Sequence, residues 1–289
     1  MQQTSPGSFL YSASDVVHFL DCEHLTSLDL RAFNEDLQKA KDDEQAILIQ
    51  EKGNLHENAF VEVLKARHAS FIDIAKTSDQ RQGKADATLK AMREGIEIIF
   101  QATFLQGELL GHADFLRRVE TPSSLGSYSY EVLDTKLARS IKAKFVVQLA
   151  FYSDLLANVQ GLLPHQMYVV LGDGKEVSLR CADYAKYYAR LKSRFLAKVH
   201  GAAQNTYPEP CSHCDLCHWR DLCAQRWKDD DHLSQVANIL KGQVRKLEDA
   251  GLKTLQDLAQ MDAQTRIPKM AAPVVRRLHN QARLQFTAR

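Results

Sequence analysis

The sequence lacks any long run of apolar residues. No stretch approaches the roughly 20 consecutive apolar residues that a bilayer-spanning helix needs, so we expect no membrane partner. The residues from Met1 to Gly7 also lack the charged-then-apolar build of a secretory signal. We therefore expect a cytoplasmic protein.

The chain also lacks a strong charge of either sign. It has 37 Lys and Arg against 36 Asp and Glu, and its net charge is +1. A protein of this balance does not bind nucleic acid through its overall charge, so any such site must come from local clusters. With 289 residues, 45% hydrophobic and 25% charged, the composition is that of a globular protein with one large domain or a main and a smaller one.

The stretch that organises the chain is Tyr130–Lys136, a run of strand-favouring residues. Alternate side chains of a strand share a face, so Asp134 and Lys136 project into one site. A carboxylate and an ammonium placed this way can bind a divalent metal and stabilise a reacting phosphate. Taken alone, the same pair is more often a surface ion pair.

Two further strands are predicted upstream, at 96–104 and 109–115. Asp114 is an acid within the second, otherwise apolar strand. Burying an unpaired carboxylate is costly, so Asp114 needs a partner. That partner is either an ion pair with Arg117 or Arg118, or a metal.

Helices are predicted on both sides of these strands, at 53–68 and 141–158. The first carries His56, which by itself is an ordinary helix histidine. In the second, Gln148 and Tyr152 are four residues apart and share a face; packing and solvation alone also explain that pair. A β-hairpin at 167–180 and another helix at 183–199 follow.

Four of the six cysteines are crowded between Cys211 and Cys223. In a cytoplasmic chain such crowding favours a metal over disulfides. Zinc is one candidate, but the compressed spacing is more typical of an iron–sulfur binder. His213 and His218 are interpreted as loop side chains. A lone Cys22 far upstream reads as a small buried hydrophobe.

Taken in order, these motifs resemble the RecB-type branch of the PD-(D/E)XK nucleases. The motifs that carry the resemblance are Gly53-x-x-His56-Glu57, Gly111-His112-Ala113-Asp114, Asp134-Thr135-Lys136 and Gln148-x-x-x-Tyr152. The resemblance implies an α/β fold with a restriction-endonuclease-like core, a central mixed sheet flanked by helices, followed by a C-terminal helical appendage.

For the active site, we expect Mn²⁺ or Mg²⁺ bound by His56, Asp114 and Asp134, with the carbonyl of Thr135 added by the resemblance. Lys136 would orient the attacking water or stabilise the transition-state charge. Gln148 and Tyr152 would position the DNA strand or the lysine. Phosphate contacts are expected from nearby basic residues, namely Arg139, Lys142 and Lys144.

The cysteines extend the resemblance to iron–sulfur members, the AddB-type subunits and CRISPR spacer-acquisition nucleases. In those, one cysteine precedes the core and three follow it as Cys-x-x-Cys-x5-Cys. The matching residues imply a [4Fe–4S] cluster on Cys22, Cys214, Cys217 and Cys223. Cys211 is one cysteine too many, and it leaves open a local four-cysteine site that would free Cys22.

We divide the chain into a nuclease domain at 1–229 and a helical segment at 230–289. The segment resembles the helix-hairpin-helix-like linker of larger RecB-family proteins, which continue into an RNase H-like domain and a helicase. We therefore expect a fragment or stand-alone piece, with a helicase on the same or another chain as partner. The alternative is that this segment is a helical appendage that only packs and does not contact DNA. Its last helix carries Arg276, Arg277, Arg283 and Arg289.

The function that these patterns predict is a metal-dependent deoxyribonuclease that hydrolyses single-stranded DNA or DNA ends in repair, recombination or defence. A second possibility is a catalytically idle module that binds DNA or scaffolds a larger helicase-nuclease. A third is a zinc-binding domain that binds RNA or protein.

Overall fold

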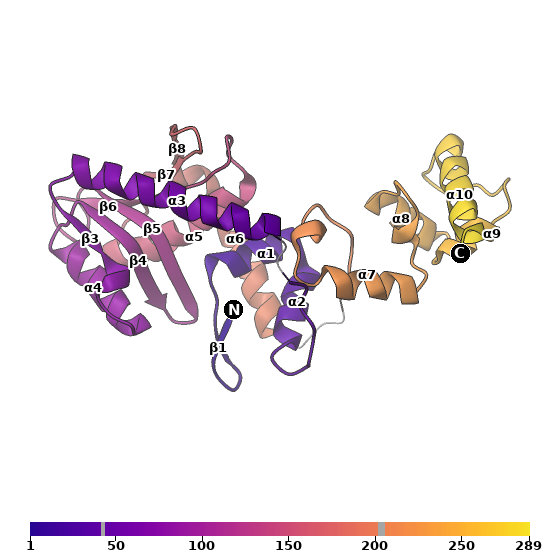
Figure 1. Cartoon of the computed structure of the whole chain (residues 1–289), viewed down its shortest axis with the longest axis horizontal. Coiled ribbons are helices and arrows are strands. Elements are labelled where there is room, and N and C mark those ends of the chain that lie inside the picture. Colours follow the sequence, from indigo (N-terminus) through magenta and orange to yellow (C-terminus); the bar gives the residue numbers. More distant parts are fainter. Residues whose placement is uncertain (42–43, 202–205) are drawn as a thin grey trace. The chain divides into compact units, whose positions relative to one another are not determined.

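The computed structural model describes residues 1–41, 44–201 and 206–289 (Figure 1). These residues form two compact units. The first comprises 1–20 and 44–201, and the second comprises 21–41 and 206–289. None of the helices in the described residues is both long and apolar enough to cross a membrane.

The first unit is built on a six-stranded mixed sheet in the order β3-β4-β5-β6-β7-β8. Strands β3 and β4 are parallel, as are β6 and β7, and the other neighbours are antiparallel. A separate hairpin joins β1 (Gln2–Ser5) to β2 (Ser8–Leu10). The strands of the large sheet are β3 (Phe71–Asp73), β4 (Ile98–Gln106), β5 (Leu109–Val119), β6 (Ser129–Thr135), β7 (Gln166–Val170) and β8 (Glu176–Arg180).

Helices cover both faces of this sheet (Figure 1). Helix α3 (Glu44–Arg67) packs Val61 and Leu64 against one face. The opposite face is covered by α1 (Ala13–Asp21), α4 (Arg81–Arg93), α5 (Ala143–Gln160) and α6 (Cys181–His200). The predicted α/β class is thereby confirmed, and the arrangement is consistent with a restriction-endonuclease-like core.

The second unit is helical. Its helices are α2 (Glu23–Arg31), α7 (Arg220–Asp229), α8 (Lys241–Asp249), α9 (Leu255–Gln260) and α10 (Ala272–Thr287). Short 3-10 turns occur in both units, at Ile74–Lys76, Cys214–Leu216 and Leu233–Gln235. The last three α-helices share a hydrophobic core of their own, in which Leu247, Leu255 and Leu278 are almost fully buried.

Strands β4 and β5 change face at one position, between two regular ladder pairs. Ladder pairing continues on either side of Gln101 and Asp114, as Phe100–Phe115 and Ala102–Ala113. In a regular strand, residues two apart share a face. Here Phe100 belongs to the core under α3, whereas Ala102 belongs to the core under α5. Gln101 absorbs this change with a φ of 55°, a conformation that non-glycine residues rarely adopt.

Gly172 follows β7 and lies against the segment that follows β6. A Cβ at this position would lie 2.3 Å from the Leu137 carbonyl oxygen. The Gly172 N–H also donates to the Ala138 carbonyl at 3.1 Å. The close approach therefore fixes the chain directly after Lys136. A Cβ at residue 172 would clash with backbone atoms, which cannot rotate away as a side chain can.

Gly172→Ala should therefore destabilise the protein by about 1–3 kcal/mol, the usual cost of overpacking. Thermal denaturation measures this. The matched control is Gly53→Ala, because a Cβ there meets nothing within 4 Å inside helix α3. The control should be neutral or stabilising by up to about 1 kcal/mol. Equal melting temperatures for the two variants would contradict the steric argument.

Candidate active site and thiol pocket

Two aspartates face each other across neighbouring strands. Phe115 of β5 pairs with Leu133 of β6 in an antiparallel register, so the next position places Asp114 opposite Asp134. The two carboxyl groups lie close enough to influence each other's charge, and Asp134 is fully buried. Burial raises the pKa of Asp114 well above its usual range, and the charge of Asp134 raises it further. The structure thus brings together the two acids that the sequence predicted.

Lys136 is the cation nearest to this pair. Its Nζ donates to Asp134 Oδ1 at 2.8 Å and lies 2.7 Å from Oδ2. The contact with Oδ1 is a hydrogen bond. The contact with Oδ2 is an ion pair without hydrogen-bond geometry. The predicted pairing of Asp134 with Lys136 is present, and Oδ2 has no hydrogen bond besides this ion-pair contact.

The alternative partners predicted for Asp114 are engaged elsewhere. Arg117 forms an ion pair with Glu176 at 3.0 Å. Arg118 forms one with Glu120 at 3.0 Å. An ion pair between Asp114 and either arginine is therefore absent from the described residues.

A third carboxylate, from Glu57 of α3, belongs to the same cluster. Burial raises the pKa of Glu57, and the charge of Asp134 acts in the same direction. Glu57 Oε1 accepts a hydrogen bond from Gln101 Nε2 at 2.7 Å, so the strained residue of β4 holds the helix acid in place. Sequence reasoning placed neither residue in the site. Glu57 is signalled only by its place beside His56, and Gln101 carries no signal in the sequence.

His56 precedes Glu57 on α3 and is partly exposed. Its Nε2 atom is nevertheless buried without a hydrogen-bond partner. Among the described residues, no hydrogen bond or ion pair joins His56 to either aspartate. Buried polar atoms normally have partners, so His56 Nε2 and Asp134 Oδ2, which have no hydrogen bond, are the atoms of this site that could take a metal as an additional partner.

Helix α5 brings Tyr152 and Gln148 to the cluster. Tyr152 is almost buried, and burial raises the pKa of its phenol, with a further rise from the charges of Asp114 and Asp134. Gln148 Nε2 donates to Tyr152 Oη at 3.4 Å. Gly111 allows this approach, because a Cβ there would lie 3.4 Å from Tyr152 Cδ1 and 2.6 Å from Leu155 Cδ1. The glycine three residues before Asp114 is therefore needed for the packing of α5 against β5.

The remaining predicted residues lie at the end of β6 and in the connection to α5. Thr135 is buried at the end of the strand. The basic residues Arg139, Lys142 and Lys144 are exposed, and no ion pair of the described residues includes them. They remain open to an anionic ligand, although no contact ties them to the acids.

The donor set suits a hard divalent cation. Three carboxylates with one lysine leave excess negative charge, and oxygen ligands are those that Mg²⁺ and Mn²⁺ prefer. In the part of the chain that the structure describes, no three donors are already arranged around one metal position.

Five cysteines line one pocket of the second unit, which we call the thiol pocket: Cys22, Cys211, Cys214, Cys217 and Cys223. All are free thiols. Cys22 immediately precedes α2, far from the others in sequence. The Sγ atoms of Cys211 and Cys214 are 3.8 Å apart. The structure thus gathers all the cysteines of the sequence motif, including the supernumerary Cys211.

Hydrogen bonds from α2 hold this pocket together. Asp29 accepts a bond from Trp219 Nε1 at 2.9 Å and contacts His218 Nε2 at 2.8 Å. Trp219 is fully buried against Leu25 and Leu28. His213 pairs with Asp21 at 3.5 Å. Both histidines of the motif therefore contact carboxylates.

Four of these thiols have raised pKa values and hold their protons more tightly than a free cysteine does. Burial raises the pKa of Cys22, of Cys214 to about 11 and of Cys223 to about 12, and neighbouring thiols contribute. A metal must displace these protons, because thiolates are the ligands. Soft thiolate donors suit zinc or an iron–sulfur cluster.

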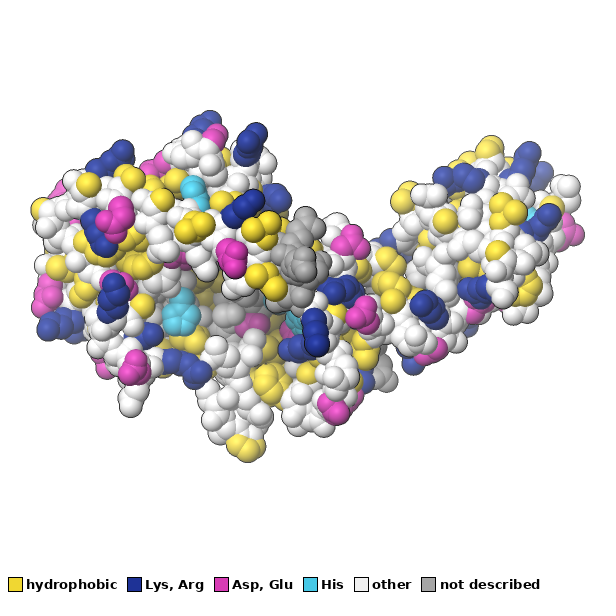
Figure 2. Space-filling model, in the orientation of Figure 1, with side chains coloured by type: hydrophobic (Ala, Val, Ile, Leu, Met, Phe, Trp, Pro, Cys, Tyr) yellow, Lys and Arg dark blue, Asp and Glu magenta, His cyan; other side chains and the backbone are white. Residues whose placement is uncertain are grey.

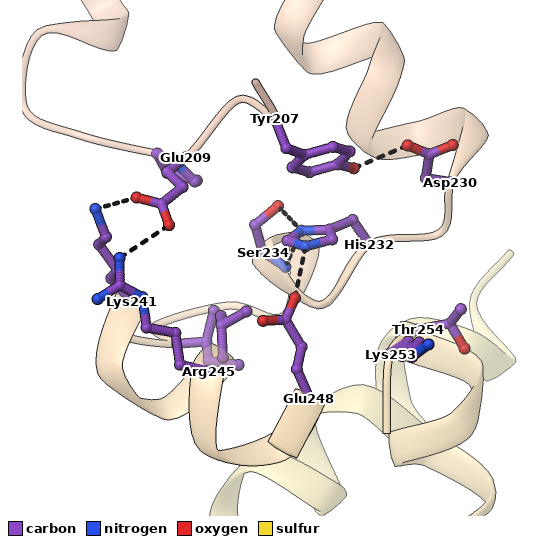
Figure 3. A pocket seen from close by; sticks show the side chains of 13 residues that line it. Tyr207, Glu209, Asp230, His232, Ser234, Lys241, Arg245, Glu248, Lys253 and Thr254 are labelled. Carbon is purple, nitrogen blue, oxygen red and sulfur yellow. Dashed lines mark hydrogen bonds and ion pairs between the residues drawn. The ribbon is translucent and has the colours of Figure 1, made fainter. Parts of the chain in front are cut away.

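A third site is a pocket of about 590 Å³ among the C-terminal helices (Figure 3). The ring of Tyr207 lies 4.8 Å from that of His232, and its hydroxyl donates to Asp230 at 2.9 Å. His232 contacts Glu248 at 3.3 Å. Glu209 engages two cations of α8, Lys241 and Arg245. The polar groups of this pocket largely satisfy one another.

Comparison with the models of known protein families gave no match, and comparison with curated proteins gave no significant match.

The electrostatics of the aspartate pair predict a pH-dependent gain in stability for Asp114→Asn. The pKa of Asp114 is raised in the folded chain. Its stabilising contribution is therefore full below the unfolded pKa of about 3.9 and is lost as the pH rises through the folded pKa. Asparagine stays neutral. In EDTA at pH 7–8, the variant should melt about 2–4 °C higher, or roughly 1 kcal/mol.

Thermal denaturation between pH 4 and pH 8 measures this effect, and the difference should vanish toward pH 4. The control is Asp173→Asn, an exposed aspartate in the turn between β7 and β8, which should change little at any pH. A variant that is less stable than the wild type at pH 8 would show that the carboxylates do not repel each other.

Proposed function

We propose that the first unit is a divalent-metal-dependent deoxyribonuclease acting on single-stranded DNA or DNA ends, of the RecB-type PD-(D/E)XK kind. The observation that supports this most is the cluster formed by Asp114, Asp134 and Lys136, with Glu57 beside them. Three acids around a single lysine are costly to assemble. A cation and a phosphate make use of that arrangement.

In this proposal, Asp114 and Asp134 hold Mn²⁺ or Mg²⁺, with Glu57 and His56 as further donors. The cation, when bound, activates a water and stabilises the charge of the pentacovalent phosphate. Lys136 leaves Asp134 to contact the attacking water or a phosphate oxygen. Tyr152, oriented by Gln148, positions the lysine or the DNA strand. The exposed residues Arg139, Lys142 and Lys144 bind backbone phosphates and make binding sensitive to salt.

The thiol pocket is proposed to hold a [4Fe–4S] cluster through Cys22, Cys214, Cys217 and Cys223. The gathering of one distant cysteine with the three spaced ones supports this set. The cluster is structural, since the segment 21–41 would be tied to residues 211–223 by metal bonds as well as by Asp29. Cys211 is then a neighbouring thiol without a bond to the cluster.

The nuclease proposal predicts Mn²⁺-dependent cleavage that Lys136→Ala abolishes. Anaerobically purified protein is incubated with end-labelled single-stranded DNA and Mn²⁺ or Mg²⁺, and the products are resolved on a gel. Loss of a positioned cation at the phosphate should reduce the rate by about 10²–10³-fold or more. The matched control is Lys175→Ala, an exposed lysine between β7 and β8, which should cleave like the wild type.

Glu57→Gln tests the helix acid in the same assay, and we expect a loss that added Mn²⁺ partly restores. If wild type and Lys136→Ala are equally inactive with the thiol pocket loaded, the catalytic proposal fails. A catalytically idle DNA-binding module would then be the better description, and DNA binding by the same preparations would measure it.

The ligand set of the thiol pocket is tested by comparing Cys22→Ala with Cys211→Ala. An iron–sulfur protein is brown and absorbs at about 400 nm, whereas zinc is colourless. We expect four irons per chain and the absorbance to be retained in Cys211→Ala and lost in Cys22→Ala. Absorbance spectra with iron, sulfide and zinc analysis provide the readout without any activity assay.

The reverse pattern, with loss in Cys211→Ala and retention in Cys22→Ala, would assign a local four-cysteine site. Zinc in a colourless protein would overturn the cluster altogether. That outcome has one geometric argument: tetrahedral Zn–S bonds of about 2.3 Å give S–S edges of about 3.8 Å, the separation of Cys211 from Cys214.

A further inference from the structure

The hairpin between α8 and α9 has no backbone donor to offer a ligand. Every N–H from Gly251 to Asp257 donates to an acceptor of the protein itself. Asp257 Oδ2 accepts from Lys253 and Thr254 at 3.0 and 2.9 Å. A helix-hairpin motif that binds phosphate needs free N–H groups at this place. Here a phosphate would have to displace a carboxylate.

Asp231 closes the same hairpin from outside it. Its carbonyl oxygen accepts from the Leu255 N–H at 2.7 Å, and its carboxylate accepts from the Gln256 N–H at 2.8 Å. Asp231 has a φ of 45°, which is unusual for a non-glycine residue. The backbone is thus held in an uncommon conformation with both acceptors directed at the start of α9.

The cations of the adjoining pocket are engaged as well (Figure 3). Glu209 binds Lys241 and Arg245, and Asp230 binds Arg226 at 2.7 Å. Arg289 pairs with Asp231. Of the three Lys and Arg side chains that line the pocket, Lys241 and Arg245 are therefore neutralised by Glu209, whereas Lys253 has no ion pair among the described residues.

The exposed face of α10 has the opposite character. From residue 263 to 289 the chain has six basic residues and no Asp or Glu. Helix α10 buries Val275, Leu278 and Ala282 in the core. Seven residues make almost two full turns, so Arg276 and Arg283 share the outer face, with Arg277 beside them. Figure 2 shows Lys and Arg side chains over these helices.

These three arginines are exposed, and no ion pair of the described residues includes them. Asn280 lies between them on the same face, and Arg266 and Lys269 precede the helix as further exposed cations. An uncompensated basic face of this kind attracts a polyanion. Its complement is a phosphate backbone, since arginine binds phosphate in a bidentate manner.

We propose that the outer face of α10, through Arg276, Arg277 and Arg283, binds the phosphate backbone of single-stranded DNA, and that the α8–α9 hairpin does not. The choice of DNA rests on the proposed nuclease function. The face supplies affinity without sequence preference, because guanidinium–phosphate contacts read charge and not bases.

The experiment is fluorescence anisotropy of a labelled single-stranded oligonucleotide with the full chain carrying Lys136→Ala, in EDTA. Binding is thereby measured without cleavage. Arg276→Gln, Arg277→Gln and Arg283→Gln are combined in one variant. Each lost phosphate contact lowers the salt slope by about 0.7, so the slope should fall by about 2. The affinity near 0.1 M salt should fall about 10- to 100-fold.

Two matched variants accompany it. Lys175→Gln, Lys186→Gln and Arg190→Gln remove three exposed charges from the first unit and should leave the slope unchanged. Lys253→Gln removes the hairpin cation and should have little effect. Equal melting temperatures would show that the α10 variant remains folded, as its substitutions are all exposed.

An unchanged slope in the α10 variant, or a larger loss in Lys253→Gln, would overturn the proposal. Displacement of the DNA by an equal concentration of polyglutamate would assign the face to acidic proteins instead and would also overturn it. The two proposals can fail separately. DNA binding through α10 by a wild type that never cleaves would remove the nuclease but keep the face, and cleavage with an unchanged slope would do the reverse.

Discussion

The antiparallel register of β5 and β6 places two carboxylates side by side. The charges around them, from Glu57 and Lys136, act on this buried pair. With Phe115 opposite Leu133, Asp114 must stand opposite Asp134. Two such groups cannot both ionise cheaply when buried, and a third acid, Glu57, lies close enough to add to the repulsion. Lys136 offsets one charge. The site therefore biases Asp114 toward its neutral form, and a bound divalent cation would reverse that bias.

The local change of face in β4 and β5 explains how both layers of helices reach this site. At the rung of Gln101 and Asp114 the two strands exchange the sides on which they pack. Glu57 reaches Gln101 from α3, while Tyr152 approaches from α5. Holding Gln101 at a φ of 55° costs about 1–3 kcal/mol. Strain of this kind, placed beside the acids, is compatible with a functional site and would be hard to justify for a packing surface.

Local patterns predicted what depends on local geometry. Asp134 and Lys136 are two residues apart at the end of a strand, and Gln148 and Tyr152 are four apart on a helix, so their contacts follow from backbone periodicity. Proximity of Asp114 to Asp134 needs the register of two strands, which the motif order suggested without fixing. The role of Gln101 in the site was not predicted, because nothing in the sequence indicates that a glutamine will adopt a positive φ. The prediction that Arg117 or Arg118 pairs with Asp114 was wrong, because these arginines form ion pairs with Glu176 and Glu120.

The C-terminal hairpin shows why a motif can specify shape without specifying function. Leu247, Leu255 and Leu258 are buried in the core of this hairpin with Leu252 packed against them, and Gly251 makes its turn with a φ of 88°. Whether the turn can bind an anion depends on its N–H groups, and these are decided by residues that the pattern does not specify. Asp257 satisfies two of them from within the hairpin, and Asp231 satisfies two more from the preceding segment. On the outer face of α10, by contrast, Arg276, Arg277 and Arg283 have no ion-pair partner among the described residues, so these cations are the ones available to an anion.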